Sequence, residues 1–403
     1  MYVTALRLTD FRSYPSAAFC LGPGPVLFLG PNGHGKTNLV EAVEYAATLG
    51  SHRTASDQPL IRRGQTQAVV HVTVRAGQED RRSLDLDLEI NLTGPNKARL
   101  NKSPVRPRDL VGALRAVVFA PEDLALAQGD PADRRGFLDA LTAARWPRLA
   151  GVKKDYDRVL SQRTALLKAL SGRSLRPAGA EAGDALEVWD EQLANLGAEI
   201  TAARLATVRE LAPFYEDRYA EIAPLRNLAE TAYLSQAEPA WEQGGGATDP
   251  AAIAERLRAE IARRRGDEIS RGQSLVGPHR DDLKLTVAGL PVKGYASHGE
   301  AWSVALGLRL ASLDLLRADG VEPVLILDDV FAELDAVRRD RLAAAAFSAE
   351  QVLITAAVAA DVPKTLAADV FWVNLGAVRR STGPGDDGAG PEAEDTAAGA
   401  AHG

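Results

Sequence analysis

The chain has 403 residues, 46% hydrophobic and 25% charged, which suits a folded globular protein of about two domains. A single cysteine, Cys20, excludes an intrachain disulfide framework and a Cys-rich zinc site. The net charge of −7 argues against general adhesion to nucleic acid, although residues 381–403 carry acids and no Lys or Arg, which leaves the rest nearly neutral. No apolar run spans a bilayer and no signal peptide is visible, so we expect a cytoplasmic protein without a membrane partner.

The first part of the chain predicts strands around one early helix. Residues 26–30 (VLFLG) form a continuous apolar run that predicts a buried strand, and residues 36–49 follow with apolar side chains at helical spacing. Residues 83–92 alternate strictly between apolar and polar side chains, which predicts a half-buried strand in an antiparallel ribbon with residues 68–75. Residues 116–120 predict a further apolar strand.

The middle of the chain, from about residue 131 to residue 272, has a mainly helical pattern. Part of it carries a heptad seam, which we interpret as intramolecular helix packing rather than as an intermolecular coiled coil. Residues 171–183 are rich in Gly, Pro and Ala and predict a loop between helices. The seam residues, at alternating spacings of three and four, are Leu186, Trp189, Leu193, Leu196 and Ile200.

Strand patterns return after Leu283. Residues 323–329 (PVLILDD), 351–357 (QVLITAA) and 370–376 (VFWVNLG) predict central strands. The economical architecture is therefore a split α/β core with a helical insertion. The acidic tail, residues 381–403, lacks aromatic side chains and is expected to be disordered.

Residues 30–37 (GPNGHGKT) match the phosphate-binding pattern G-x-x-x-x-G-K-[ST], between a predicted strand and a predicted helix. The glycines let the backbone wrap around phosphates, and amide groups at the helix start point toward them. Lys36 is expected to neutralise the β- and γ-phosphates of ATP, and the Thr37 hydroxyl to coordinate Mg²⁺. The predicted nucleotide-binding residues of this loop are Gly30, Pro31, Asn32, Gly33, His34, Gly35, Lys36, Thr37 and Asn38.

Two acids end the apolar strand at residues 323–329. Asp328 is expected to hold Mg²⁺, together with Thr37, and Asp329 to position or deprotonate the attacking water. A long stretch of chain separates Lys36 from Asp328, whereas a small-metabolite kinase or a GTPase usually brings these motifs closer. Such an insertion is typical of ABC-type ATPases of the DNA-repair and chromosome-structure branch.

Three further segments fit the ABC class. Residues 296–300 (ASHGE) open an apolar helix and resemble the ABC signature, in which we expect Ser297 and Gly299 to reach the γ-phosphate held by a second subunit. Ser297 would equally suit an ordinary helix N-cap. Residues 333–335 (ELD) stand where ABC proteins carry a dimer-contact loop. Thr355 ends the next strand, where a switch residue senses the γ-phosphate.

With these residues in place, the chain resembles the RecF family of bacterial recombination mediators, from Met1 to about Gly376. The family usually has Gln where this chain has His298 and Glu300. The added carboxylate is expected to weaken the contact with a neighbour's triphosphate unless it points away. The matching segments are LTDFRSY (8–14), GKTNL (35–39), VFAPEDL (118–124), PADRRGFLD (131–139), GPHRDDL (277–283) and LDDVFAELD (327–335).

The resemblance implies an ABC-type P-loop ATPase head of the α/β class, with a mixed sheet, an antiparallel β ribbon and an inserted helical lobe. Residues 1–130 and 273–380 would form the ATPase lobe, and residues 131–272 the helical lobe. The implied activity is a weak, DNA-stimulated ATPase that uses ATP and Mg²⁺. The expected catalytic residues are Lys36, Ser297, Asp328, Asp329 and Thr355.

The resemblance also implies partners. ATP would close two subunits head to tail into a homodimer with a DNA-binding surface, and hydrolysis would open it. RecF-like proteins cooperate with RecR and RecO to load recombinase onto gapped DNA, favouring single-strand/double-strand junctions. A nucleoid-associated cytoplasmic protein is therefore expected. Two alternatives stay open: a scaffold that binds ATP with little hydrolysis, and the ATPase subunit of an ABC transporter.

The residues say less about where DNA would bind. A basic loop could bind phosphates without reading bases, or could be an ordinary solvated loop. Residues 277–282 could contact nucleotide, but we favour a structural turn whose Arg–Asp pair holds the helical insertion to the sheet. Arg12 is a possible contact on the adenine side. The cations of the basic loop are Lys97, Arg99, Lys102, Arg106 and Arg108.

Overall fold

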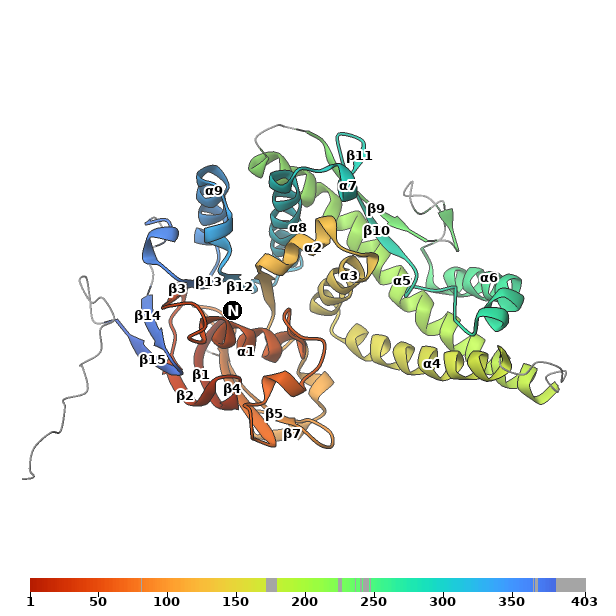
Figure 1. The fold of residues 1–403 in the computed structure, drawn as a ribbon, viewed down its shortest axis with the longest axis horizontal. Helices are drawn as coiled ribbons and strands as arrows, with labels where there is room; N and C mark the ends of the chain where they lie inside the picture. The colour runs from red at the N-terminus through yellow and green to blue at the C-terminus, as the bar shows by residue number, and fades with distance from the viewer. Residues whose placement is uncertain are drawn as a thin grey trace, which may run out of the picture.

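The computed structural model describes residues 1–80, 82–171, 180–223, 227–235, 237–239, 241, 246, 248–364, 366 and 369–381. Two sheets enclose the helix that follows the glycine-rich loop, and long helices extend from them to one side (Figure 1). The acidic tail predicted to be disordered lies, apart from Ser381, outside the described residues.

The first sheet is mixed and, within the described residues, six-stranded, in the order β15-β14-β3-β13-β12-β8. All of its neighbouring strands pair in parallel except β14 and β15, which form an antiparallel hairpin. Every residue of β12 and β13 is buried, as expected for central parallel strands covered on both faces. The strands are β3 (Gly24–Leu29), β8 (Ala116–Phe119), β12 (Val324–Asp328), β13 (Gln351–Ala356), β14 (Asp369–Asn374) and β15 (Ala377–Arg380).

The register of the parallel strands determines where the site forms. Leu29 of β3 lies opposite Ala356 of β13, and Thr355 of β13 lies opposite Asp328 of β12. The carboxyl ends of the three strands therefore coincide at one edge of the sheet, which is where ligands bind in α/β folds of this kind. The glycine-rich loop leaves β3 at the same edge and leads into α1 (Lys36–Thr48).

The second sheet is antiparallel, with the order β2-β1-β4-β5-β6-β7. The predicted ribbon is its centre: Leu86, Leu88 and Ile90 of β5 are buried, while their neighbours along the strand are partly exposed. The two N-terminal strands, which the sequence patterns did not predict, extend it. Apolar residues of α1 pack between this sheet and the first. The strands are β1 (Tyr2–Phe11), β2 (Tyr14–Cys20), β4 (Gln67–Arg75), β5 (Ser83–Asn91), β6 (Lys97–Leu100) and β7 (Ser103–Val105).

The helical region packs around α5, which contacts α3, α4, α6 and α8. Leu186, Leu193 and Ile200 of the predicted seam are buried in this packing, as the intramolecular interpretation expected. The predicted loop at 171–183 lies mostly outside the described residues, although α5 already begins at Ala180. The helices are α2 (Leu124–Gln128), α3 (Pro131–Arg145), α4 (Arg148–Ser171), α5 (Ala180–Ile222), α6 (Pro250–Arg271), α7 (Val292–Tyr295), α8 (His298–Ala318) and α9 (Ala336–Phe347).

A small antiparallel sheet with the order β11-β10-β9 covers part of the helical region. β9 (Ala229–Leu234) pairs with β10 (Asp282–Val287), and β11 (Leu290–Pro291) completes the sheet. This pairing and the packing of α8 on α5 both cross the predicted lobe boundary between residues 272 and 273. The division into lobes therefore stays a proposal. Short 3₁₀ turns are η1 (Gln58–Leu60), η2 (Pro107–Leu110), η3 (Pro121–Asp123), η5 (Val330–Glu333) and η6 (Ala359–Asp361).

None of the helices in the described part of the chain combines the length and the apolarity that a membrane crossing requires.

Candidate nucleotide-binding site

The loop between β3 and α1 has the conformation that its glycines allow. Gly33 and Gly35 have φ angles of 81° and 107°, in the left-handed region. A Cβ atom on Gly35 would lie 2.8 Å from the Ser13 hydroxyl, so a side chain there would meet both steric and backbone strain. The loop leads directly into α1, whose first amides are open to an anion. These features fit a phosphate-binding cradle.

Lys36 and Thr37 point in complementary directions. The buried Lys36 side chain turns back along the loop, and its Nζ donates to the Pro31 carbonyl and to Asn32 Oδ1, both at 3.3 Å. The Thr37 hydroxyl donates to Asp328 Oδ1 at 3.0 Å and so joins the loop to the end of β12. An alcohol and a carboxylate oxygen are ligands that Mg²⁺ prefers, so this pair fits the predicted metal position.

The other loop residues differ in their surroundings. Pro31, Asn32 and Gly33 are exposed, whereas His34 carries a buried Nδ1 without a hydrogen-bond partner. The Asn38 side chain donates to the Ser13 hydroxyl and accepts from Arg53. These bonds occupy the Asn38 side chain in this structure, and its nucleotide contact stays a prediction.

Thr355 organises the two acids at the end of β12. Its hydroxyl donates to Asp328 Oδ1 at 2.6 Å and accepts from the backbone amide of Asp329 at 2.9 Å. Asp329 adopts a left-handed conformation with φ 51°, which turns the chain at the strand end. Burial raises the pKa of Asp329, with Lys36 acting in the opposite direction. A carboxylate with a raised pKa is a better proton acceptor.

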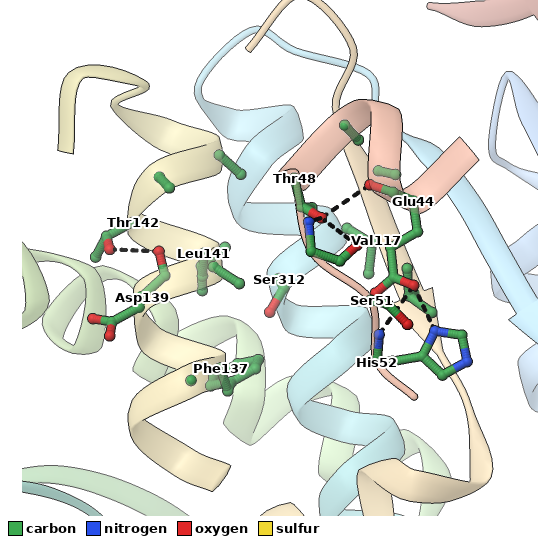
Figure 2. Close-up of a pocket in the computed structure, with 18 of the residues that line it drawn as sticks. Glu44, Thr48, Ser51, His52, Val117, Phe137, Asp139, Leu141, Thr142 and Ser312 are labelled. Atoms are coloured by element: carbon green, nitrogen blue, oxygen red, sulfur yellow. Dashed lines mark hydrogen bonds and ion pairs between the residues drawn. The ribbon is translucent and has the colours of Figure 1, made fainter. Parts of the chain in front are cut away.

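The structure adds a residue that the sequence did not single out, His52. Its Nδ1 lies 2.5 Å from Glu44 Oε2 (Figure 2), and its Nε2 lies 3.5 Å from Asp328 Oδ2. Burial alone would lower the pKa of His52, but the neighbouring carboxylates of Asp328 and Glu44 raise it to about 10. The two carboxylates thus favour the charged form of the His52 imidazole. The sequence carries no local signal for this position, because His52 reaches Asp328 only when the segment after α1 folds back along the helix.

Five of the residues predicted to bind Mg²⁺ or to act in catalysis lie together, and we call them the strand-end cluster. Two residues of the predicted signature lie elsewhere. Ser297 and Gly299 lie at the start of α8, on the side of the molecule where α7 lies (Figure 1). Ser297 is the N-cap of α8, one of the two roles considered for it. The strand-end cluster consists of Lys36, Thr37, Asp328, Asp329 and Thr355.

The possible adenine contact, Arg12, has an internal partner. It pairs with Glu41 of α1, to which Nε donates at 2.8 Å, and its Nη1 donates to the Pro59 carbonyl at 3.0 Å. The side chain therefore ties α1 to η1.

A cleft of about 890 Å³ opens between α1, α3 and α8 (Figure 2). Glu44 and His52 line one side of it, and Phe137 and Ser312 line the other parts. Residues 30–37 do not line it. The cleft is therefore separate from the phosphate-binding loop, and we do not assign nucleotide to it.

The predicted basic loop comprises the β6–β7 hairpin and the start of η2. Lys97 pairs with Glu89 at 2.8 Å, and Arg106 pairs with Asp109 at 2.9 Å. Lys102 stands in the turn with a left-handed φ of 68°. Lys97 and Arg106 are therefore paired with acidic side chains of the same chain. A DNA contact of this loop stays a prediction.

Comparison with known proteins places this geometry in a family. Residues 2–367 match the family model described as the RecF/RecN/SMC N terminal domain. The DNA replication and repair protein RecF of Cutibacterium acnes is 53% identical over 395 residues, covering 96% of this chain and all of that protein. RecF of Streptomyces avermitilis is 52% identical over 383 residues, covering 94% of this chain and again the whole relative. The chain belongs to the RecF family.

Solved structures agree with this placement. One described as the recombination mediator protein RecF-ATP in the RecFOR pathway superposes with a TM-score of 0.83 at 26% identity, covering 94% of this chain and 97% of that one. An Smc head domain from Pyrococcus furiosus matches with a TM-score of 0.50 at 14% identity over 94% of this chain and 96% of that one, and shows the fold alone. The predicted class, an ABC-type ATPase head, is confirmed.

Two RecF family motifs outside the strand-end cluster, PADRRGFLD and GPHRDDL, contact each other. Arg134 of the first donates to both carboxylate oxygens of Asp282 in the second, at 2.8 Å each. Arg204 of α5 donates to the Pro278 carbonyl at 2.7 Å. The second motif thus connects α3, α5 and β10, which supports the structural interpretation. The predicted Arg–Asp pair within this motif does not form, because Arg280 donates to the Ser274 carbonyl. The observed pair is Arg134–Asp282, which joins the two motifs.

Proposed function

We propose that this chain is an ATP-dependent DNA-binding recombination mediator. The observation that carries the proposal is the strand-end cluster, where Thr37 and Thr355 both donate to Asp328 beside a glycine-rich loop. Membership of the RecF family supports the DNA substrate, because the relatives are named as DNA replication and repair proteins.

In this proposal the loop amides and Lys36 bind the phosphates of ATP. Thr37 and Asp328 would hold Mg²⁺, which, when bound, supplies positive charge to the β- and γ-phosphates. Asp329 positions the attacking water and accepts its proton at the carboxylate. Thr355 fixes the geometry of both acids, because one hydroxyl contacts the Asp328 side chain and the Asp329 amide.

A second subunit completes the site. Ser297 and Gly299 would direct donors at the γ-phosphate bound by the partner, since the start of α8 favours negative charge. ATP would thus close a head-to-tail homodimer around DNA, and slow, DNA-stimulated hydrolysis would release it. The preferred DNA would be a gap or a single-strand/double-strand junction, where a cytoplasmic, nucleoid-associated mediator loads recombinase.

RecR and RecO are the protein partners of this proposal. Support comes from the RecFOR pathway, to which the similar RecF structures are assigned.

One observation favours a second candidate, a scaffold that binds ATP with little hydrolysis. The Ser297 hydroxyl donates to Glu300 Oε2 at 2.8 Å and is therefore engaged within its own helix. If hydrolysis requires the Ser297 hydroxyl to contact the γ-phosphate of the partner subunit's ATP, the bond to Glu300 must break first. Turnover would then be slow, while ATP binding at the glycine-rich loop would be unaffected.

Phosphate release, measured with and without gapped DNA, separates the two candidates. The mediator proposal predicts measurable turnover that rises with DNA, and turnover lost in both Lys36→Ala and Asp329→Asn. Binding of a fluorescent ATP analogue should be lost only in Lys36→Ala. Analogue binding without turnover in the unaltered protein, with or without DNA, would support the scaffold instead.

A further inference from the structure

Arg338, in the first turn of α9, contacts two segments that are far apart in the sequence. Its Nε donates to the hydroxyl of Ser303 on α8 at 2.9 Å. Its Nη1 pairs with Asp335, and its backbone amide donates to Asp335 Oδ1 at 2.9 Å. Only 11% of the Arg338 side chain is exposed, so the guanidinium is largely enclosed by these partners.

The guanidinium also lies against the start of α8. A Cβ atom on Gly299 would stand 3.2 Å from Arg338 Nη2 and 3.6 Å from its Cζ. The Ser303 hydroxyl that accepts from Arg338 donates in turn to the Gly299 carbonyl at 3.1 Å. Arg338 is thus packed on Gly299 and connected to it through Ser303.

These contacts connect two segments expected to face a second subunit. The dimer-contact segment, residues 333–335, follows β12 through the turn η5, directly beyond Asp328 and Asp329. The signature segment, residues 296–300, includes Gly299. Asp335 caps α9 and Gly299 lies in the first turn of α8, so the side chain of Arg338 is a direct bridge between the two segments.

We propose that Arg338 is a positioning residue that fixes the separation of the dimer-contact segment and the signature segment within one subunit. The proposal rests on the ATP-dependent homodimer of the proposed function. Both segments must meet the partner in one docking event. If they move independently, the entropy of ordering them reduces the affinity of the dimer.

The planar guanidinium is suited to this role because it serves Ser303 and Asp335 with different nitrogens while its face packs on Gly299. A lysine has a single charged nitrogen and cannot reproduce this geometry. Arg338→Ala and Arg338→Lys should therefore each weaken the ATP-dependent dimer by about tenfold or more. Binding of ATP to the monomer should not change, because Arg338 lies outside the strand-end cluster.

The test is the monomer–dimer equilibrium in Mg·ATP, measured by analytical ultracentrifugation in an Asp329→Asn background that slows hydrolysis. Binding of a fluorescent ATP analogue and the melting temperature are measured on the same samples. Ser303→Ala keeps the Arg338–Asp335 pair and should give a smaller loss of affinity. Arg258→Ala is the matched control, because it removes an exposed ion pair with Glu191 elsewhere on the chain.

A weakened dimer in both Arg338 variants, with analogue binding and melting temperature like those of the control, supports the role. If Arg338→Ala fails to fold, Arg338→Lys and Ser303→Ala decide the question. Dimerisation of the folded variants equal to that of the control would overturn the inference while leaving the proposed function intact. If the Asp329→Asn background itself stays monomeric with ATP bound, the proposed homodimer fails, and the role of Arg338 fails with it.

Discussion

Glu300 accepts hydrogen bonds from both the backbone amide and the hydroxyl of Ser297, at 2.9 and 2.8 Å. The Glu300 amide donates back to the Ser297 hydroxyl at 3.3 Å, which completes a capping box at the start of α8. These bonds, the backbone one foremost, lower the pKa of Glu300. The residue that departs from the usual family pattern thus stabilises its own helix and remains charged beside the proposed partner phosphate.

Replacing Glu300 with Gln should tighten the ATP-dependent dimer. Gln also forms a capping box, so the helix start is kept, while the negative charge near the partner's triphosphate is removed. We expect an affinity gain of about threefold or more in the monomer–dimer equilibrium with Mg·ATP at low salt. The gain should shrink as salt is added, and a dimer no tighter than that of the unaltered protein would show that the carboxylate does not face the phosphate.

Replacing Thr355 with Val should slow ATP hydrolysis with little effect on ATP binding. Val keeps the shape of the side chain but removes the hydroxyl that contacts Asp328 Oδ1 and the Asp329 amide. We expect single-turnover hydrolysis to fall by about tenfold or more. Thr355→Ser retains a hydroxyl and should recover most of the rate. Equal rates in the Val and Ser variants would contradict the proposed role.

The Glu44–His52 pair should contribute measurably to stability. Removing His52 takes a positive charge away from two buried carboxylates, since the Glu44 and Asp328 side chains are only 10% and 5% exposed. His52→Ala should therefore lower the free energy of unfolding by about 2–4 kcal/mol in urea without Mg²⁺. Adding Glu44→Gln should recover part of this loss. Strict additivity of the two changes would show that the two side chains are not coupled.

His279 should make the protein sensitive to acid. Its Nε2 donates to the Ser274 carbonyl at 3.2 Å, so Nδ1 accepts from the Tyr156 hydroxyl at 2.6 Å, and the ring is held neutral. Burial lowers the pKa of His279 from 6.5 to about 4. The unfolded chain therefore binds the proton more readily, and the stability from this group is present above pH 6.5 and lost as the pH falls toward 4.

Between pH 8 and pH 5 this group alone should cost about 2 kcal/mol of unfolding free energy. Urea titrations at both pH values measure the loss, and a His279→Gln variant provides the reference, because Gln does not titrate. The variant should be less stable at pH 8 but should lose less on acidification. Parallel pH dependence in the two proteins would place the acid-sensitive group elsewhere.

Local patterns were sufficient to predict the strand-end cluster. Lys36 and Thr37 belong to a contiguous motif, and Asp328 ends an apolar run, so parallel strands bring them to one edge without further information. His52 could not be predicted, because its role depends on the segment after α1 folding back along the helix toward Asp328. Arg338 was missed for the same reason, since Ser303 and Gly299 lie on a distant helix.

Among the strands, too, those with a local sequence pattern could be predicted, and those that depend on a distant partner could not. The alternation of β5 predicted its buried face correctly. By contrast, β9 lies in a region of helical pattern and becomes a strand by pairing with β10, where Tyr233 lies opposite Leu283. Pairing across such a distance leaves no periodicity in the sequence, so the small sheet could not be predicted.

The most direct test of nucleotide-gated DNA binding is fluorescence anisotropy of a labelled duplex with a single-stranded gap, titrated with protein at moderate salt. Asp329→Asn slows hydrolysis, and the titration is run with and without Mg·ATP. We predict binding that requires ATP and that is lost when Lys36→Ala is added to Asp329→Asn. Equal binding with and without ATP, or in the Lys36→Ala protein, would contradict the nucleotide gate, and no binding under either condition would contradict autonomous DNA recognition.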